Sequence, residues 1–272
     1  MAKISPKITF ALEFPVKISE NYPDVLKEYW GVDIIYDPVL FFSKVQSEAK
    51  KLSADFVSVY FNIENEEEIA HCKEVLFKIQ DIAAIPLIVK GTGQKSLDAL
   101  LVPELISVLK KPSVIAFAQD LNYKPIINAG LEGSHTFVLR TPIDINLTKE
   151  LNILSTDLGL SKEKILIDPD MGCVGYGLDY GYSIIERIKL AREAGDRMLD
   201  MPIIVFSGEE SFKAKEAKSK DFAPSWGELE TRSVAWEIAT TTSLIYAGAN
   251  AVVVWHPKTI ETLKPLVEGT KC

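Results

Sequence analysis

The sequence predicts an α/β protein built as a (β/α)8 TIM barrel. Three observations lead to this prediction. Short apolar runs rich in β-branched and aromatic residues occur eight times, and each is followed by a stretch with apolar residues at helical spacing. Such alternation indicates βαβ units and a parallel sheet. The length of 272 residues is close to the roughly 250 that these barrels need. A doubly wound open sheet is the alternative.

The first four strands are expected in the amino-terminal half of the chain. Their near-continuous apolar character suits a parallel sheet that is covered on both faces. The expected strands are residues 8–14 (ITFALEF), 55–61 (DFVSVYF), 85–93 (IPLIVKGTG) and 113–119 (SVIAFAQ). The helices expected after them are residues 37–53, 65–80, 96–110 and 122–133.

The second half of the chain repeats the alternation of strand and helix. The expected strands are residues 135–144 (HTFVLRTPID), 164–170 (KILIDPD), 201–210 (MPIIVFSGEE) and 250–257 (NAVVVWHP). The helices expected after them are residues 146–160, 179–195, 228–248 and 259–269. Eight strand and helix pairs in sequence order favour closure of the sheet into a barrel.

No low-complexity segment or Ser/Gly linker interrupts this pattern, so we expect one TIM-barrel domain over residues 1–272. The only long polar excursion is KAKEAKSKDFAPSWG, residues 213–227, between the seventh strand and its helix. This excursion is either a solvated helical face or a surface for a partner. The chain carries 30 Lys and Arg against 38 Asp and Glu. A net charge of −8 argues against nucleic-acid binding.

Cysteine content and hydrophobicity limit the class of protein further. Cys72, Cys173 and Cys272 form an odd set without C-x-x-C spacing, which fits a reducing compartment. Three thiols cannot supply the four thiolates that a [4Fe–4S] cluster usually takes. No apolar run approaches the roughly 20 residues of a membrane span. The start of the chain lacks the apolar core of a signal peptide. We therefore expect a cytoplasmic protein with no membrane partner.

The segments that follow the strands contain most of the specialised residues. In a barrel these segments meet at the carboxyl-terminal mouth, where binding and catalytic sites lie. They read KGTG, AQDLN, RTPIDIN, DPDMGCVGYG, SGEE and WHP after strands three to eight. The polar members are Gln119, Asn122, Arg140, Asp144, Asp168, Asp170, Glu209 and His256. We expect the functional site on this face.

Two groups at the mouth allow more than one interpretation. Gly91, Thr92 and Gly93 permit close approach of the backbone to a flat ligand, or form an ordinary tight turn. Asp168 and Asp170 suit acid–base chemistry, or hold the loop by accepting its N–H groups.

The histidines and Cys173 give weaker indications. His256 follows strand eight directly, where it has either a functional or a structural role. His71 is expected to be solvated on a surface helix, and His135 is expected to be structural. No Cys/His cluster has metal-ligand spacing, so no metal site is expected. Cys173 lies on the mouth as a wall residue rather than a nucleophile. Tyr176, Tyr180 and Tyr182 would offer an aromatic surface to a broad flat ligand such as a macrocycle or a pterin, or pack into the core.

Several motifs in sequence order identify a family. IVKGTG, NYKPIINAG, TPIDINLTKELNILSTDLGL, IDPDMGCVGYGLDYGYSIIERIKLA, GDRMLDMPIIV and WGELETRSVAWEIATTTSLIYAGANAVVVWHP resemble the corrinoid iron–sulfur protein small subunit. This subunit is also called the delta subunit of the acetyl-CoA decarbonylase/synthase complex. The resemblance runs from about Asp33 to Pro257, which is nearly the whole chain.

The resemblance implies a barrel that forms a heterodimer with a large corrinoid iron–sulfur subunit. That partner would carry the [4Fe–4S] cluster and the cobalamin, and the mouth of this barrel would cap the cobalamin. The pair would carry a methyl group from methyl-tetrahydrofolate, or a methanopterin analogue, to acetyl-CoA synthase. This is one-carbon metabolism by the Wood–Ljungdahl pathway, with the methyltransferase and acetyl-CoA synthase as transient partners. The chain would be a methyl-carrier subunit rather than an independent catalyst.

The resemblance and the strand-end positions together imply a corrinoid-facing set with no catalytic residue and no metal ligand. Its members are Gly91, Thr92, Gly93, Asn122, Arg140, Thr141, Pro142, Asp144, Asp168, Asp170, Met171, Gly172, Cys173, Gly175, Tyr176, Gly177, Gly208, Glu209 and His256. Two alternatives stay open: a stand-alone pterin-dependent or corrinoid-dependent methyltransferase on the same barrel, and a scaffold barrel without a ligand.

Overall fold

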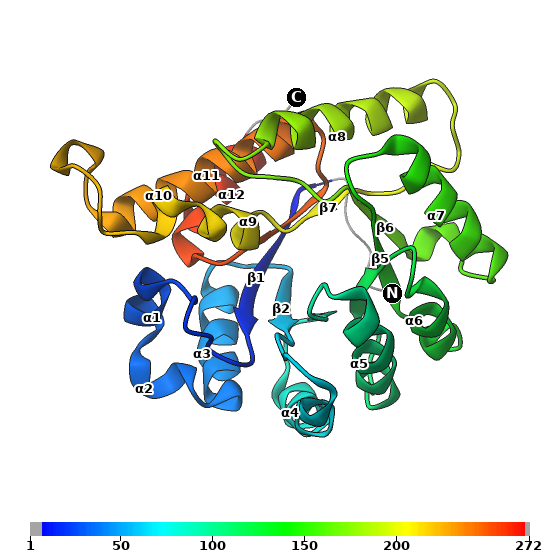
Figure 1. Ribbon diagram of the computed structural model, residues 1–272, viewed down its shortest axis with the longest axis horizontal. Coiled ribbons are helices and arrows are strands. Elements are labelled where there is room, and N and C mark those ends of the chain that lie inside the picture. Colours follow the sequence, from blue (N-terminus) through cyan, green and yellow to red (C-terminus); the bar gives the residue numbers. More distant parts are fainter. Residues whose placement is uncertain (1–6, 270–272) are drawn as a thin grey trace.

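Eight parallel strands form one curved sheet in residues 7–269, which are the residues that the computed structural model describes (Figure 1). Cys272 and the first six residues lie outside this range. The strands are β1 (Thr9–Pro15), β2 (Phe56–Tyr60), β3 (Leu87–Lys90), β4 (Val114–Ala118), β5 (Thr136–Arg140), β6 (Ile165–Asp168), β7 (Ile204–Val205) and β8 (Ala251–Val254). Each lies within a run predicted from the sequence, except that β1 extends one residue past its run to Pro15.

The sheet closes on itself. Its strand order is β6-β5-β4-β3-β2-β1-β8-β7, and the two outer strands of that order meet through a parallel bridge between Ile167 and Ile203. The amide of Ile167 donates to the carbonyl of Pro202 at 2.9 Å across this seam. The (β/α)8 barrel is thus confirmed, and the open-sheet alternative is not.

The alternation of side chains along each strand produces two hydrophobic cores. Residues at every second position point into the barrel, because successive side chains of a strand point to opposite faces. The inner core consists of Ala11, Phe56, Ile88, Val114, Ala116, Phe117, Val138, Leu166, Ile204, Phe206, Ala251 and Val253. The outer core lies between the strands and the surrounding helices, with Phe41, Leu76 and Ile184 among its fully or almost fully buried members.

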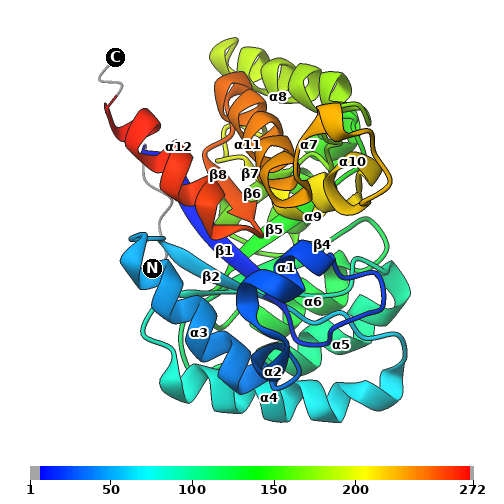
Figure 2. The ribbon, with the colours of Figure 1, turned by 90° about the vertical axis from the view of Figure 1, so that its left-hand side faces the viewer.

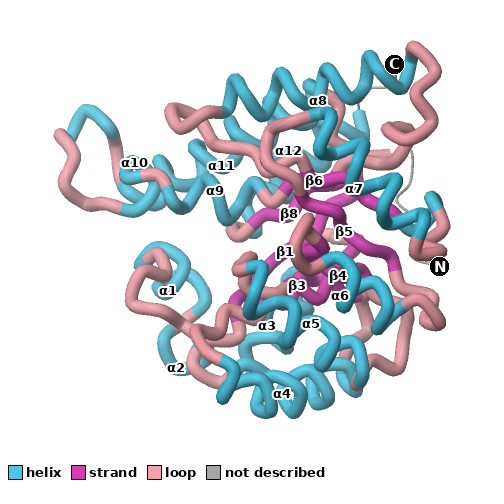
Figure 3. The backbone as a smooth tube through the Cα atoms, turned by 45° about the vertical axis from the view of Figure 1, so that its right-hand side comes forward, coloured by secondary structure: helices cyan, strands magenta, loops and turns pink. Residues whose placement is uncertain are grey.

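Helices surround the barrel, as the tube view shows (Figure 3). The helices that follow strands one to four are α3 (Pro38–Lys51), α4 (Ile69–Ile82), α5 (Lys95–Ser107) and α6 (Tyr123–Gly130). Those that follow strands five to eight are α7 (Ile145–Asp157), α8 (Leu178–Glu193), α11 (Leu229–Ala247) and α12 (Pro257–Gly269). Short 3-10 helices η1 (Glu66–Glu68) and η2 (Lys162–Lys164) precede α4 and β6.

Two insertions enlarge the mouth of the barrel. The connection after β1 contains α1 (Asp24–Trp30) and α2 (Val32–Ile35), which the sequence pattern did not predict. The connection after β7 contains α9 (Ser207–Lys213), α10 (Lys215–Lys218) and the 3-10 helix η3 (Pro224–Trp226). Figure 2 shows both insertions on the side of the barrel that faces the viewer. β7 is shorter than its predicted run because α9 begins at Ser207.

Candidate functional site at the barrel mouth

A layer of charged and aromatic side chains forms the floor of the mouth. It arises where the inward-pointing positions of the strands reach the carboxyl ends, above the apolar inner core. The strand register brings Lys90 beside Tyr60, Glu13 beside Ser58, and Arg140 beside Asp168. Side chains from alternate strands stack in such layers in this fold. The layer is therefore set by the pairing of strands far apart in sequence.

Lys90 lies at the centre of the layer. Its Nζ donates to Glu13 Oε1 at 2.7 Å and to Glu209 Oε2 at 2.6 Å, and it lies 4.0 Å from the centre of the Tyr60 ring. The side chains of Lys90 and Glu13 are 1% and 0% exposed. Burial disfavours the charged amine, but the attraction of the two carboxylates outweighs it and raises the pKa of Lys90. Lys90 is therefore a cation and not a nucleophile.

Glu13 and Glu209 are both held by further donors. Glu13 also accepts hydrogen bonds from the Ser58 hydroxyl at 2.6 Å and from the Trp255 indole N–H at 2.8 Å. Glu209 also pairs with Lys213 at 3.1 Å. Burial works against ionisation of Glu209, yet the nearby cations Lys90 and Lys213 outweigh it and hold the pKa of this carboxyl well below its usual range.

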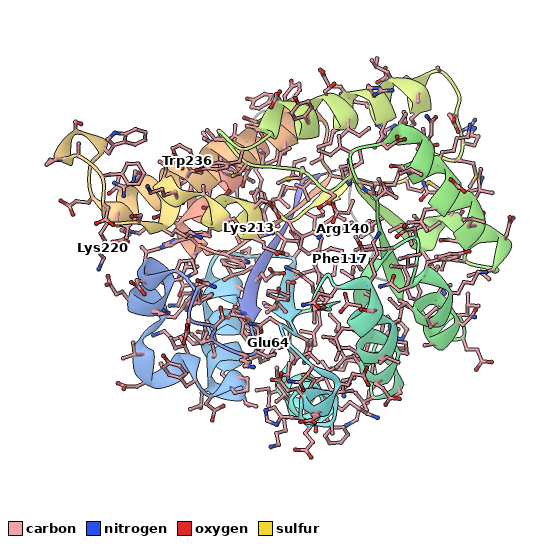
Figure 4. All side chains as sticks on the ribbon, viewed as in Figure 1. Glu64, Phe117, Arg140, Lys213, Lys220 and Trp236 are labelled. Atoms are coloured by element: carbon pink, nitrogen blue, oxygen red, sulfur yellow. The ribbon has the colours of Figure 1, made fainter. Side chains whose placement is uncertain are left out.

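A second ion pair lies across the same floor. Arg140 Nε donates to Asp168 Oδ2 at 2.7 Å, and its guanidinium group lies 3.4 Å from the centre of the Phe117 ring (Figure 4). Asp170 lies 3.9 Å from the same guanidinium group and is half exposed. Burial raises the pKa of Asp168, with Arg140 acting against that shift. Phe117 in turn packs edge-on against Phe206 at 4.7 Å, so aromatic rings separate the two cationic centres.

The loop Asp168–Gly177 is held by its own contacts and by α11. Asp168 Oδ1 accepts a hydrogen bond from the Asp170 amide at 3.0 Å, and the backbone turns at Asp170 with φ 51°. Thr240 and Trp236 of α11 hold both polar groups of the Val174 backbone, at 3.2 and 3.1 Å. A Cβ on Gly172 would lie 2.1 Å from the Tyr176 carbonyl, so only glycine permits this closure. The loop is preformed.

The loop after β3 depends on a residue of the following helix. Asp98 is fully buried, and its carboxylate accepts hydrogen bonds from the amides of Thr92 and Gly93 at 2.7 and 2.8 Å. A Cβ on Gly91 would lie 2.6 Å from Asp98 Oδ1. Burial raises the pKa of Asp98, whereas these donors lower it. Gly91 makes room for the chain's own carboxylate, whereas Gly93, with φ 85° and no atom within 4 Å of a Cβ, allows the backbone to turn.

The end of β8 is held by Glu237 of α11. Its carboxylate accepts hydrogen bonds from the amides of Trp255 and His256 at 2.6 and 3.2 Å, and from the Thr259 hydroxyl at 2.5 Å. Complete burial raises the pKa of Glu237 to about 7. Burial also lowers the pKa of His256 to about 4, so the imidazole is neutral. Its Nδ1 accepts a hydrogen bond from the Lys258 amide at 3.2 Å.

The structure divides the sequence-predicted site residues by their exposure. All lie at or after the carboxyl ends of strands, so the barrel places them around one mouth. The members with exposed or half-buried side chains or backbones are Thr92, Gly93, Arg140, Pro142, Asp144, Asp170, Gly172, Gly175, Tyr176, Gly177 and Glu209. The buried members are Gly91, Asn122, Thr141, Asp168, Met171, Cys173, Gly208 and His256. The buried set shapes the mouth and has little surface to offer a ligand in this conformation.

Several members have structural roles that the sequence left open. Asp144 caps α7 by accepting hydrogen bonds from the amides of Asn146 and Leu147. Asn122 accepts a hydrogen bond from the Gln119 amide at 2.7 Å and donates to the Lys95 carbonyl at 3.2 Å. Burial raises the pKa of the Cys173 thiol to about 11, which leaves it protonated and poorly reactive.

Sequence reasoning missed the residues that build the floor or hold the segments around it. They lie inside predicted strands or on the following helices rather than in the loops, and they are Glu13, Tyr60, Lys90, Asp98, Phe117, Phe206, Glu237 and Trp255. One signal was present in the sequence. A charged residue within an apolar run, such as Glu13 in FALEF or Lys90 in LIVK, needs a buried partner when its neighbours are all in the core.

Two hollows adjoin the mouth. One of about 530 Å³ lies between α6 and α7 and is lined by residues that include Leu121, Arg140 and Pro142. The other, of about 580 Å³, is an open groove beside the Asp168–Gly177 loop, next to Tyr182 and Ser243. Within residues 7–269 no group of three or more His, Cys, Asp or Glu side chains is arranged to hold a metal ion. In the same range no helix has the length and hydrophobicity needed to cross a bilayer.

Fold and site together define a (β/α)8 barrel whose mouth has an internally paired ionic floor. Such barrels act through the carboxyl ends of their strands. The family model of the CO dehydrogenase/acetyl-CoA synthase delta subunit matches residues 14–268, and the chain belongs to this family. The resemblance inferred from the sequence motifs is thereby confirmed.

Curated relatives are delta subunits of the acetyl-CoA decarbonylase/synthase complex. The subunit of Methanopyrus kandleri is 30% identical over 252 residues, covering 90% of this chain and 61% of the relative. The delta 1 subunit of Methanosarcina thermophila is 28% identical over 236 residues, covering 82% of this chain and 53% of the relative. The chain thus spans a little over half the length of these relatives.

Solved structures with a similar fold are dihydropteroate synthases. The enzyme of Xanthomonas albilineans superposes with a TM-score of 0.65 at 14% identity, covering 98% of this chain and 94% of the other. The enzyme of Thermus thermophilus gives a TM-score of 0.62 at 12% identity, covering 97% and 94%. At this identity the likeness supports the barrel fold alone.

Proposed function

We propose that this barrel caps a corrinoid held by a partner subunit and supports methyl transfer to acetyl-CoA synthase. The methyl donor would be methyl-tetrahydrofolate or a methanopterin analogue, as in the Wood–Ljungdahl pathway. The observation that carries the proposal is a ring of exposed apolar side chains around the mouth. Its members follow four different strands, and they are Tyr36, Leu121, Ile143 and Tyr176.

The residues around the mouth fit a surface that covers a corrinoid better than a site that binds one by itself. A corrin ring is broad and largely apolar, so an apolar rim suits its edge and face. The rim's most exposed members, Leu121 and Tyr36, are 78% and 70% exposed and would lose water on contact with such a surface. The ring's amide side chains would find polar groups at Asp170 and Thr92.

Among the described residues, no histidine is placed where it could reach a corrinoid at the mouth. His256 is fully buried and its ring packs 4.7 Å from Tyr29, while His135 is buried at the opposite end of the barrel and His71 lies on α4. The corrinoid is therefore assigned to the partner in this proposal. When bound there, it supplies the methyl-accepting and methyl-donating cobalt. The mouth excludes water and orients access to it.

The test uses paired charge substitutions in the rim. L121D/I143D places two carboxylates where the corrinoid would be covered, and L190D/Y246D makes the same change on exposed positions of α8 and α11 outside the rim. Each variant is co-purified with the native corrinoid-carrying partner. The visible absorption of the corrinoid and the rate at which Co(I) is oxidised are then measured.

We expect faster Co(I) oxidation and weaker co-purification only for L121D/I143D. Equal rates of Co(I) oxidation and equal co-purification for the two double variants would refute the cap hypothesis. The isolated chain is expected to bind methylcobalamin weakly or not at all.

A second candidate is direct binding of a pterin in the mouth. It is favoured by the polar floor, because polar groups converging inside a barrel suit a small heterocycle. Similar solved structures include a Yersinia pestis dihydropteroate synthase with a pterine-sulfa conjugate. Against this candidate, the carboxylates of the floor are already paired with Lys90, Lys213 and Arg140. Titration of the purified chain with methyl-tetrahydrofolate distinguishes the two, since tight binding with turnover would favour a stand-alone methyltransferase.

A further inference from the structure

The excursion after β7, residues 213–227, differs in charge from the rest of the chain; we call it the basic projection. It contains Lys213, Lys215, Lys218 and Lys220 against Glu216 and Asp221, whereas the whole chain has a net charge of −8. Lys213 pairs with Glu209 and Glu210 at the mouth. The side chains of Lys215 and Lys218 are exposed and form no ion pair with any other residue of the described range.

The basic projection is rigidly held despite its exposure. Arg232 of α11 is buried and donates to the carbonyls of Glu216, Ser219 and Gly227 at 2.6, 2.7 and 3.0 Å. Ser233 donates to the Ala217 carbonyl at 2.5 Å. A loop that only needs solvation does not require a buried guanidinium group to fix three carbonyls. A preorganised surface loses less conformational entropy when it binds.

An aromatic side chain completes this surface. Trp226 is 48% exposed and packs against Phe222 at 5.1 Å between ring centres, and Phe222 in turn lies under the Arg232 guanidinium group at 4.8 Å. Tryptophan is enriched among the residues that dominate protein–protein binding energy. The projection thus combines free positive charge with a fixed apolar anchor.

The projection is continuous with the mouth. Glu216 accepts a hydrogen bond from the Tyr176 hydroxyl at 2.9 Å, which joins α10 to the Asp168–Gly177 loop. On the other side, Lys220 lies 3.5 Å from Glu28 of α1, and Figure 4 shows Lys220 directed toward that helix. A partner that covers the mouth therefore also reaches the projection.

We propose that the basic projection docks an acidic patch of the corrinoid-carrying partner subunit, with Trp226 as its apolar anchor. This inference rests on the proposed function. The chemistry favours a protein over a polyanion such as RNA, because the projection has a small local charge excess on a strongly acidic chain. Charge complementarity would speed encounter and orient the partner on the mouth.

The experiment measures binding of the purified, immobilised corrinoid-carrying subunit to three variants of the full chain. K215E/K218E reverses the free charge of the projection. K78E/K111E makes the same change at exposed lysines of α4 and of the α5–β4 connection, which form no ion pair with other described residues. W226A removes the anchor. Thermal melting and far-ultraviolet circular dichroism verify that each variant is folded.

We expect K215E/K218E to raise Kd about 10-fold at low salt and much less at about 0.5 M NaCl, mainly through a slower association rate. W226A should raise Kd by about 10-fold to 30-fold at both salt concentrations, through faster dissociation. K78E/K111E should bind like the wild type. Those three results together support the docking site.

Other results overturn it in distinguishable ways. Wild-type affinity for K215E/K218E and W226A, with the rim variant L121D/I143D still impaired, would refute the docking site and leave the cap intact. No binding of the wild-type chain to the corrinoid subunit would refute both. Lysine-dependent binding of a single-stranded RNA homopolymer, without an effect on the subunit, would assign the projection to a different partner class and refute the proposal.

Discussion

Replacement of Lys90 by methionine tests whether the floor of the mouth is a buried ionic network. Methionine nearly matches the length of lysine but carries no charge, so K90M leaves Glu13 and Glu209 without their shared cation. Both carboxylates lie within 2.7 Å of the Lys90 nitrogen, and their side chains are only 0% and 15% exposed. Removal of one partner from a buried ion pair costs about 3–5 kcal/mol. We expect a loss of stability of that size at about pH 8.

The ionic network also predicts the direction in which the stability of K90M changes with pH. Without the cation, the pKa of at least one of the two carboxyls rises above its unfolded value of about 4.3. The folded variant then binds more protons than the unfolded chain, so its stability increases as the pH falls from about 8 to about 5. In the wild type, the pKa of Glu209 is depressed, and the stability that it contributes is lost only as the pH falls below about 4.3. The cost of K90M should therefore shrink at about pH 5.

Urea unfolding followed by tryptophan fluorescence at the two pH values measures these differences. K78M, at an exposed lysine of α4, should stay within about 0.5 kcal/mol of the wild type. E13Q/K90M should recover part of the loss, since it removes one unpaired charge. A cost of K90M below about 1 kcal/mol at the higher pH, or a cost independent of pH, would refute the ionic network.

Three further predictions concern the residues that hold the mouth. The pKa of Glu237 is raised, so the stability that this group contributes is full below about pH 4 and is lost as the pH rises through about 7. The free energy of unfolding of E237Q, measured in urea, should therefore increase by roughly 3 kcal/mol relative to that of the wild type between about pH 5 and pH 8; a constant difference would contradict this. G172A should cost about 1–3 kcal/mol, because its Cβ meets the Tyr176 carbonyl, whereas G269A, with no atom nearby, should be neutral in the same unfolding assay. D98N places an amide nitrogen against an N–H donor, so hydrogen exchange should accelerate at the amides of Thr92 and Gly93. Exchange should stay unchanged at the amides of Asn146 and Leu147, which Asp144 holds. Unchanged exchange at all four amides would argue against the role of Asp98.

The barrel itself could be predicted because its signal is local and repeated. Each apolar run, such as residues 113–119, has the period and composition of a buried strand, and eight units in order leave few topologies. The α1–α2 insertion was not predicted, because its helices are short and their apolar residues do not repeat over several turns. Its role is tertiary: Trp30 of α1 packs against Phe41 at 5.6 Å.

The floor of the mouth could be predicted only in part. Arg140 and Asp168 were found from their place at strand ends, but their pairing depends on the register of β5 and β6. Lys90 and Glu13 are 77 positions apart in sequence and meet only after the sheet curls. Asp98 and Glu237 lie on helices, so a search confined to loops passes over them. These partners are determined by closure of the barrel and not by any local motif.

Helix α11 connects three neighbouring rim segments to one rigid body. Thr240 and Trp236 hold the loop after β6, and Arg232 holds the projection after β7. Glu237 holds the turn after β8. A shift or tilt of this single helix would therefore carry a whole arc of the rim with it. Access to the floor of the mouth can then be controlled by one collective movement. A substitution on the outer face of α11 can alter this access without changing any residue of the mouth.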